Sequence, residues 1–170
     1  LDFKKEGDLI YLIGQAVNDI ASSEYVYSYK KIKATPAPNF NLETEQKVQK
    51  SIAGLINARL IQSAHDVSDG GLLITLAESS FPRKLGFSVQ GDAHIRRDAF
   101  WFGEAQSRVM VSVDAQNKAT FESFLNQNNQ VFSLIGEVNG KDMSVDNQVV
   151  STLQGAFDSY HSALETALMN

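Results

Sequence analysis

The sequence has no cysteine, only three prolines and no long apolar run. Without cysteine, the chain cannot build a disulfide framework, a cysteine metal site or a cysteine nucleophile. No apolar segment approaches the roughly 18 residues that a membrane-spanning helix requires. The first residues, LDFKKE, lack the apolar centre of a secretory signal. We therefore expect a cytoplasmic protein with no membrane partner.

Positive charge is also scarce, since 15 Lys and Arg stand against 20 Asp and Glu, for a net charge of −5. An acidic protein is repelled by nucleic-acid phosphates, so we expect no nucleic-acid partner. Hydrophobic residues make up 43% of the 170 residues, and a chain of this length buries roughly 70% of its unfolded surface. We interpret residues 1–170 as one domain and, because the chain does not begin with Met, as a piece of a longer protein.

Apolar periodicity predicts strands and helices that follow one another along the whole chain. Strands are predicted at 9–13, 64–67, 87–90, 108–114 and 131–138, with a strand or hairpin at 142–150. Helices are predicted at about 43–62, 71–79 and 115–127 and after a capping box at 151–154; a short helix near 22–29, a linker at 30–40 and a helix or irregular segment at 94–102 complete the order. This order predicts an α+β fold with a mixed β-sheet flanked by helices.

The clearest helix is the one at about 43–62. Its apolar residues recur at helical spacing, and Asn41 is a suitable N-cap. We expect the following residues to face the core: Val48, Ile52, Leu55, Ile56 and Leu60.

The segment 64–72, AHDVSDGGL, runs from a predicted strand end into a predicted helix start. Asp66 and Asp69 supply the hard oxygen ligands that Mg²⁺ takes beside substrate phosphates. Ser68, Gly70 and Gly71 lie where the free N–H groups of a helix N-terminus favour a phosphate. The segment has a simpler interpretation as well, in which Ser68 or Asp69 is only an N-cap and the two glycines only form a tight turn.

A second polar segment, 102–108 with the sequence FGEAQSR, directly precedes a predicted strand. Arg108 is suited to a bidentate contact with a carboxylate or a phosphate. The alternative is a turn in which Arg108 pairs with Glu104 and holds the strand end. Neither segment points to a catalytic residue, and the sequence assigns no role to His65 or His94.

Together, these two segments resemble the C-terminal half of the phosphoribosylformylglycinamidine synthase family. Three shorter segments extend the resemblance over nearly the whole chain: GDLIYLIG at 7–14, SEY at 23–25 and IGEV at 135–138. The resemblance implies a fold like the C-terminal domain of AIR synthase, with α/β/α layers. The wider superfamily includes aminoimidazole ribonucleotide synthetase, which varies the Ser-Asp pair before the glycines.

The resemblance implies a ligase of purine biosynthesis. That family converts formylglycinamide ribonucleotide, ATP and glutamine-derived ammonia to the amidine, with ATP and Mg²⁺ as cofactors. The implied partners are the substrate, the N-terminal domains of the same enzyme, a separate glutaminase subunit and a small bridging subunit. We expect the isolated chain to be inactive and to associate with a second copy of itself through the face that its N-terminal domains normally cover.

Residue by residue, the resemblance implies that Asp66 is a Mg²⁺ ligand and that Glu104 and Gln106 contact the substrate. Ala105 stands where the family has a serine. The His-Asp-x-Ser-Asp-Gly-Gly form belongs to the family's second half, where the pocket is often an auxiliary nucleotide site or a structural site. A domain of aminoimidazole ribonucleotide synthetase and a non-catalytic scaffold therefore stay open as alternatives.

Overall fold

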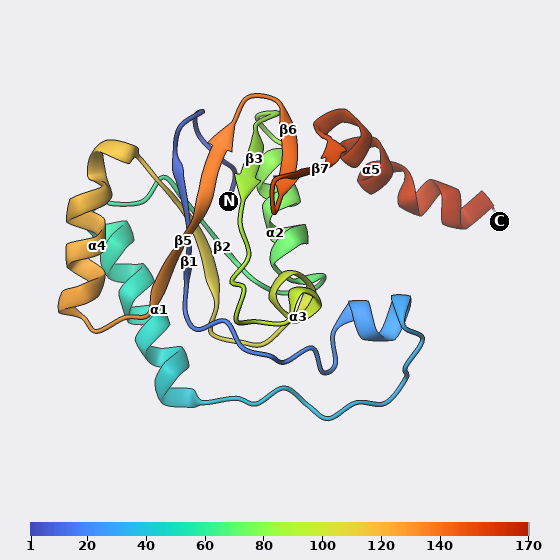
Figure 1. Ribbon diagram of the computed structural model, residues 1–170, viewed down its shortest axis with the longest axis horizontal. Coiled ribbons are helices and arrows are strands. Elements are labelled where there is room, and N and C mark those ends of the chain that lie inside the picture. The colour runs from blue at the N-terminus through green and yellow to red at the C-terminus, as the bar shows by residue number, and fades with distance from the viewer. Residues whose placement is uncertain (170) are drawn as a thin grey trace.

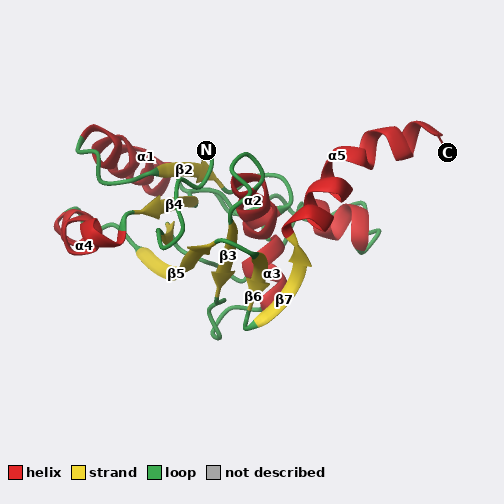
Figure 2. Ribbon diagram, turned by 90° about the horizontal axis from the view of Figure 1, so that it is seen from above, coloured by secondary structure: helices red, strands yellow, loops and turns green. Residues whose placement is uncertain are grey.

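The computed structural model describes residues 1–169, and its centre is one mixed β-sheet (Figures 1 and 2). Seven strands lie in the spatial order β2-β4-β1-β5-β3-β6-β7. Their bounds are β1 Leu9–Ile13, β2 Ser63–Asp66, β3 Gly86–Val89, β4 Val109–Val113, β5 Phe132–Asn139, β6 Asp142–Val145 and β7 Gln148–Thr152. Neighbouring strands pair antiparallel except β3 and β6, which pair parallel.

Helices cover both faces of the sheet, which confirms the predicted α+β class and its layers (Figure 2). The helical elements are a π-helical turn η1 Tyr25–Tyr29, α1 Leu42–Asn57, α2 Gly71–Ser80, α3 Arg97–Phe102, a 3-10 turn η2 Ala115–Asn117, α4 Lys118–Gln127 and α5 Leu153–Met169. The segment 30–40 has no regular structure, as its composition predicts. Within residues 1–169, no helix combines the length and the apolar character needed to cross a membrane.

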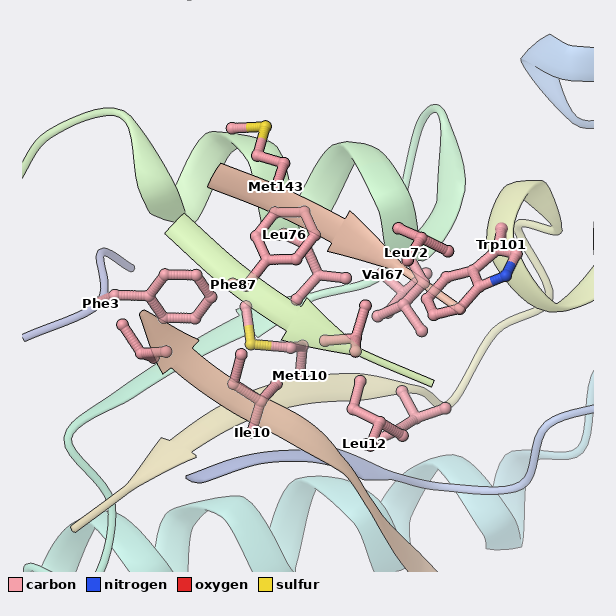
Figure 3. Close-up of a cluster of buried hydrophobic side chains, with 14 of the residues drawn as sticks. Phe3, Ile10, Leu12, Val67, Leu72, Leu76, Phe87, Trp101, Met110 and Met143 are labelled. Carbon is pink, nitrogen blue, oxygen red and sulfur yellow. The ribbon is translucent and has the colours of Figure 1, made fainter. Parts of the chain in front are cut away.

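Alternation along β1 divides the interior into two cores. Tyr11 and Ile13 pack under α1 and α4, whereas Ile10 and Leu12 face α2 and α3. The larger core, on the α2 side, is drawn in Figure 3. Its labelled members are Phe3, Ile10, Leu12, Val67, Leu72, Leu76, Phe87, Trp101, Met110 and Met143. Because β1 is central and buried on both faces, it reads as a continuous apolar run.

The helix α1 begins as predicted, because the Asn41 side chain accepts a hydrogen bond from the Thr44 N–H at 2.8 Å. Its predicted end is wrong by several residues, since α1 stops at Asn57. Arg59 adopts a left-handed backbone with φ +55°, and the Leu60 N–H bonds the Leu55 carbonyl across this reversal. Ile56 is 54% exposed and does not belong to the core, which corrects the predicted stripe.

The C-terminal region consists of a hairpin and a projecting helix. Asp146 and Asn147 both have positive φ, as a two-residue turn between β6 and β7 requires. The Thr152 hydroxyl accepts a hydrogen bond from the Gly155 N–H at 3.1 Å and caps α5, so the cap lies one residue after the predicted Ser151. The first turns of α5 pack Phe157 on Phe81, and the rest of α5 extends away from the sheet (Figure 1).

Candidate functional site

Strand pairing brings the two polar segments together. Asp66 ends β2, Val109 begins β4, and the two residues are partners in the antiparallel β2–β4 ladder. The turn that follows Asp66 and the loop that precedes Val109 therefore lie at the same end of the sheet. Asp66 and Val109 are about forty residues apart in the sequence, and the register of this ladder makes the two segments neighbours.

A cleft of about 810 Å³ opens between these segments and α1. One wall is mainly apolar. It consists of Phe40, which precedes α1 in the sequence, and of the α1 residues Val48, Ile52, Ala53 and Ile56. The opposite wall carries the polar residues of both segments, including Asp66, Ser68, Asp69, Glu104, Gln106, Ser107 and Arg108. The cleft can thus hold a ligand with one apolar side and one polar side.

The turn between β2 and α2 depends on its two glycines. Gly70 and Gly71 have φ of +83° and +73°, a left-handed backbone that glycine adopts without steric cost. A Cβ atom on Gly71 would lie 2.7 Å from the backbone of Phe102. Gly71 therefore allows the N-terminus of α2 to pack directly against the end of α3, where the second segment begins.

The N–H groups that the sequence predicts as a phosphate cradle are already bonded within the chain. The Gly71 N–H donates to the Ser68 carbonyl at 2.9 Å, and the Gly70 N–H donates to Oε1 of Glu104 at 2.8 Å. The carboxylate of Glu104 thus lies at the N-terminus of α2, where a phosphate was expected. Of the three predicted phosphate-binding residues, Ser68 is exposed at the cleft.

Arg108 is a buried residue, with 3% of its surface exposed. Its guanidinium donates to the carbonyls of Gly103 and Ala105 and so closes the loop before β4. Arg108 forms no salt bridge with Glu104, so the turn predicted as the alternative, in which these two side chains pair, is wrong on this point. Burial lowers the pKa of Arg108 to about 10, and the charge of Asp19 partly opposes this shift. At neutral pH, Arg108 is therefore a buried cation bonded to backbone carbonyls.

Asp66, Asp69 and Gln106 are exposed, in contrast to Arg108. The Asp66 side chain is 74% exposed and lies 3.8 Å from Nδ1 of His65. His65 also approaches Glu78, with 3.3 Å between Nε2 and Oε2. No group of three His, Cys, Asp or Glu side chains that could hold a metal forms within residues 1–169. Asp66 and Asp69 both line the first cleft, and their carboxylate oxygens are the type of ligand that Mg²⁺ takes beside water and substrate phosphates.

Several residues of the site were not predicted from the sequence. Glu45 of α1 accepts a hydrogen bond from the Ser107 hydroxyl at 2.7 Å and joins α1 to the second segment. The Glu24 N–H donates to Glu104 at 2.8 Å. A smaller cleft of about 330 Å³ lies beside residues 22–35 and shares Asp69 and Glu104 with the first. His94 is exposed and lines neither cleft.

The family profile described as AIR synthase related protein, C-terminal domain, matches residues 5–146. The chain belongs to this family. A phosphoribosylformylglycinamidine synthase subunit PurL from Synechococcus sp. is 38% identical over 157 residues, which cover 90% of the chain and 20% of that protein. The PurL of Alkaliphilus metalliredigens is 35% identical over 143 residues, 84% of the chain and 19% of that protein. The chain thus spans about a fifth of the length of these PurL relatives.

Solved structures support the fold of this AIR synthase-related domain. The PurL of T. maritima complexed with FGAR superposes with a TM-score of 0.74 at 18% identity, covering 91% of the chain and 28% of that protein. A thiamine-monophosphate kinase from Stenotrophomonas maltophilia superposes with a TM-score of 0.56, also at 18% identity, covering 88% of the chain and 53% of that protein. At 18% identity, these superpositions support the fold of the chain but do not establish its activity.

Proposed function

We propose that the chain is a C-terminal domain of a phosphoribosylformylglycinamidine synthase. The complete enzyme makes formylglycinamidine ribonucleotide from formylglycinamide ribonucleotide, ATP and ammonia in purine biosynthesis. One observation carries the proposal: the two segments that resemble this family, far apart in the sequence, border one cleft through the β2–β4 ladder. The names of the PurL relatives and the substrate and nucleotide complexes of T. maritima PurL support the same assignment.

The residues of this chain serve the reaction by binding and orientation. When bound with Mg²⁺, ATP would supply the phosphoryl group that makes the amide oxygen displaceable by ammonia, with release of ADP and phosphate. Asp66 and Asp69 would hold Mg²⁺, the Ser68 hydroxyl would bind a phosphate, and the Gln106 amide would contact the substrate, since all four residues line the first cleft. The apolar wall on α1 excludes water from the opposite side of the ligand. Substrate contacts of Glu104 and Arg108 stay predictions. Both side chains form hydrogen bonds with backbone groups of the chain itself.

The proposal extends to the surroundings of the domain. Residues 1–170 form one domain of a longer cytoplasmic enzyme, and the active site is complete only with its N-terminal domains. A separate glutaminase subunit and a small bridging subunit would deliver ammonia, and the solved structure of PurLQS from Thermotoga maritima supports the presence of further subunits. Association of the isolated domain with a second copy is a further prediction, which its mass in solution at high concentration would test.

The test compares the isolated 170-residue chain with the complete polypeptide that contains it. Both are supplied with formylglycinamide ribonucleotide, ATP, Mg²⁺ and ammonium chloride, and both amidine formation and phosphate release are measured. Free ammonia removes the need for a glutaminase. We expect turnover by the complete polypeptide only. An inactive, folded complete polypeptide would contradict the proposed reaction, and an active isolated chain would contradict the composite site.

A variant separates the ligand role of Asp66 from a scaffold role of the whole domain. We expect Asp66→Ala in the complete polypeptide to lose most of its activity while its thermal unfolding stays unchanged, since this side chain is largely exposed. Unchanged activity would favour the scaffold alternative. Glu137→Gln is the control, because Glu137 is exposed on β5 and lines neither cleft.

A further inference from the structure

We infer that Glu104 is a positioning residue that fixes the Asp66–Gly71 turn and the start of η1 at Glu24 in their places beside the two clefts. Oε1 of Glu104 accepts hydrogen bonds from two backbone donors, the Gly70 N–H and the Glu24 N–H, each at 2.8 Å. Gly70 is 34 residues away in the sequence and Glu24 is 80 residues away. One carboxylate oxygen therefore joins three segments that have no local connection.

The position of this carboxylate suits its negative charge. The N-terminus of α2 presents N–H groups that have no partner within the helix, and the helix dipole favours an anion there. Charge-assisted hydrogen bonds of this kind are roughly twice as strong as bonds between neutral groups. Glu104 therefore supplies from within the chain the anion that the helix terminus would otherwise take from a ligand.

The turn needs such a restraint because of its composition. Glycine has more backbone freedom than any other type of residue, and Gly70 and Gly71 follow one another here. Asp69, directly before them, is exposed. The bond from Gly70 to Glu104 removes this freedom next to Asp66 and Asp69. Asp69 and Glu104 both line the two clefts, so the restraint acts on the wall that the clefts share.

This inference deepens the proposed function and differs from the predicted substrate contact in one testable respect. A positioning role needs a hydrogen-bond acceptor at the Oε1 position, whereas a contact with Mg²⁺ or a cationic group needs the charge. Glu104→Gln keeps an acceptor and removes the charge, and Glu104→Ala removes both. The two variants therefore give different results for the two roles.

The experiment uses the complete polypeptide with three variants: Glu104→Ala, Glu104→Gln and the control Glu137→Gln. Amide hydrogen exchange is followed by mass spectrometry in peptides that cover Glu24 and Gly70, and kcat and KM are measured for amidine formation with ammonia. We expect Glu104→Ala to speed exchange in both peptides by about tenfold, the equivalent of one lost hydrogen bond. We expect kcat to fall about tenfold with little change in KM. Glu104→Gln should stay within about threefold of the parent in both measurements.

Unchanged exchange in Glu104→Ala would overturn the inference. So would a Glu104→Gln variant that keeps normal exchange but loses as much activity as Glu104→Ala, because the charge would then act on a ligand directly. Hydrogen exchange does not depend on the reaction. If the parent polypeptide showed no amidine formation, the proposed function would fail, and the exchange data alone would still decide the role of Glu104.

Discussion

The turn at 66–71 and the loop at 102–108 border the same cleft but use their charged groups differently. In the loop, Arg108 is buried on two backbone carbonyls and Glu104 is bonded to two backbone N–H groups. In the turn, the carboxylates of Asp66 and Asp69 are exposed. Groups bonded to the backbone determine where the chain lies, whereas exposed groups are available to a ligand. The charged groups of the loop therefore hold the chain in place, whereas those of the turn are open to solvent at the cleft.

The largest effect is expected where turn and loop touch. Gly71→Ala should lower the free energy of unfolding by about 3 kcal/mol, because it adds a left-handed alanine and a contact of 2.7 Å with the Phe102 backbone. Gly7→Ala is the matched control, since Gly7 has φ +85° but a Cβ atom there would meet nothing within 4 Å. Urea unfolding measures both variants. Equal losses would show that backbone conformation alone, and not the contact with the loop, makes Gly71 necessary.

A slightly smaller loss is expected inside the loop. Arg108→Met keeps an unbranched apolar stem but leaves the carbonyls of Gly103 and Ala105 without their donors, which should cost about 2 kcal/mol of unfolding free energy. The same variant tests the predicted substrate contact. Unchanged stability together with a raised KM would place Arg108 among the ligand-binding residues and weaken the contrast between loop and turn.

A buried carboxylate outside the cleft sharpens the comparison. Asp8 is fully buried, and neither of its carboxylate oxygens has a hydrogen-bond partner among residues 1–169, unlike Oε1 of Glu104. Burial raises the pKa of Asp8, and the charge of Lys5 partly opposes this shift. The folded state therefore binds a proton more tightly than the unfolded state. The contribution of Asp8 to stability is greatest below pH 4 and declines as the pH rises through its raised pKa.

The corresponding variant is Asp8→Asn, which cannot ionise. We expect its unfolding free energy, measured relative to the parent, to be higher at pH 7 than at pH 3.5. The effect should be smaller than that of Arg108→Met because Lys5 already offsets part of the charge. Guanidinium chloride unfolding at both pH values measures it, and a difference that does not vary with pH would contradict the raised pKa.

The smallest effect on stability is expected in the turn. Asp66→Asn and Asp69→Asn should each change the unfolding free energy by less than about 0.5 kcal/mol, as exposed substitutions usually do. Their effect should appear instead as a higher Mg²⁺ concentration for half-maximal activity of the complete polypeptide. A stability loss above about 1.5 kcal/mol would mean that these carboxylates hold the structure, as the loop residues do.

Local pattern was sufficient for most of the fold. The apolar run at 9–13 is β1, the Gly71 start of α2 lies where it was expected, and the alternation at 108–114 contains β4. The end of α1 was misplaced because Leu60 continues the apolar spacing after the chain has already reversed at Arg59. Leu60 still packs against the core, so its apolar character says nothing about its backbone.

The candidate site was only partly accessible from the sequence. Both polar segments were found, and the exposure of Asp66 and Asp69 agrees with a binding role. The partners of Glu104 and Arg108 could not be found in the same way. Backbone groups carry no sequence signal, and Glu24 and Gly70 lie 80 and 34 residues from Glu104. Motif resemblance indicated that these residues matter but not which atoms they bond.

The strand order also determines how the domain must fold. Leu9 of β1 pairs with Val113 on one side and Glu137 on the other, and β3 is enclosed between β5 and the later strand β6. Contacts between such distant residues slow the folding of a chain. During synthesis, β1 has no strand partner until β4, Val109–Val113, has been made, and the sheet is complete only after β7, which ends at Thr152. A chain ending before β5 would leave an edge of β1, one of the most apolar strands, open to pairing with other molecules.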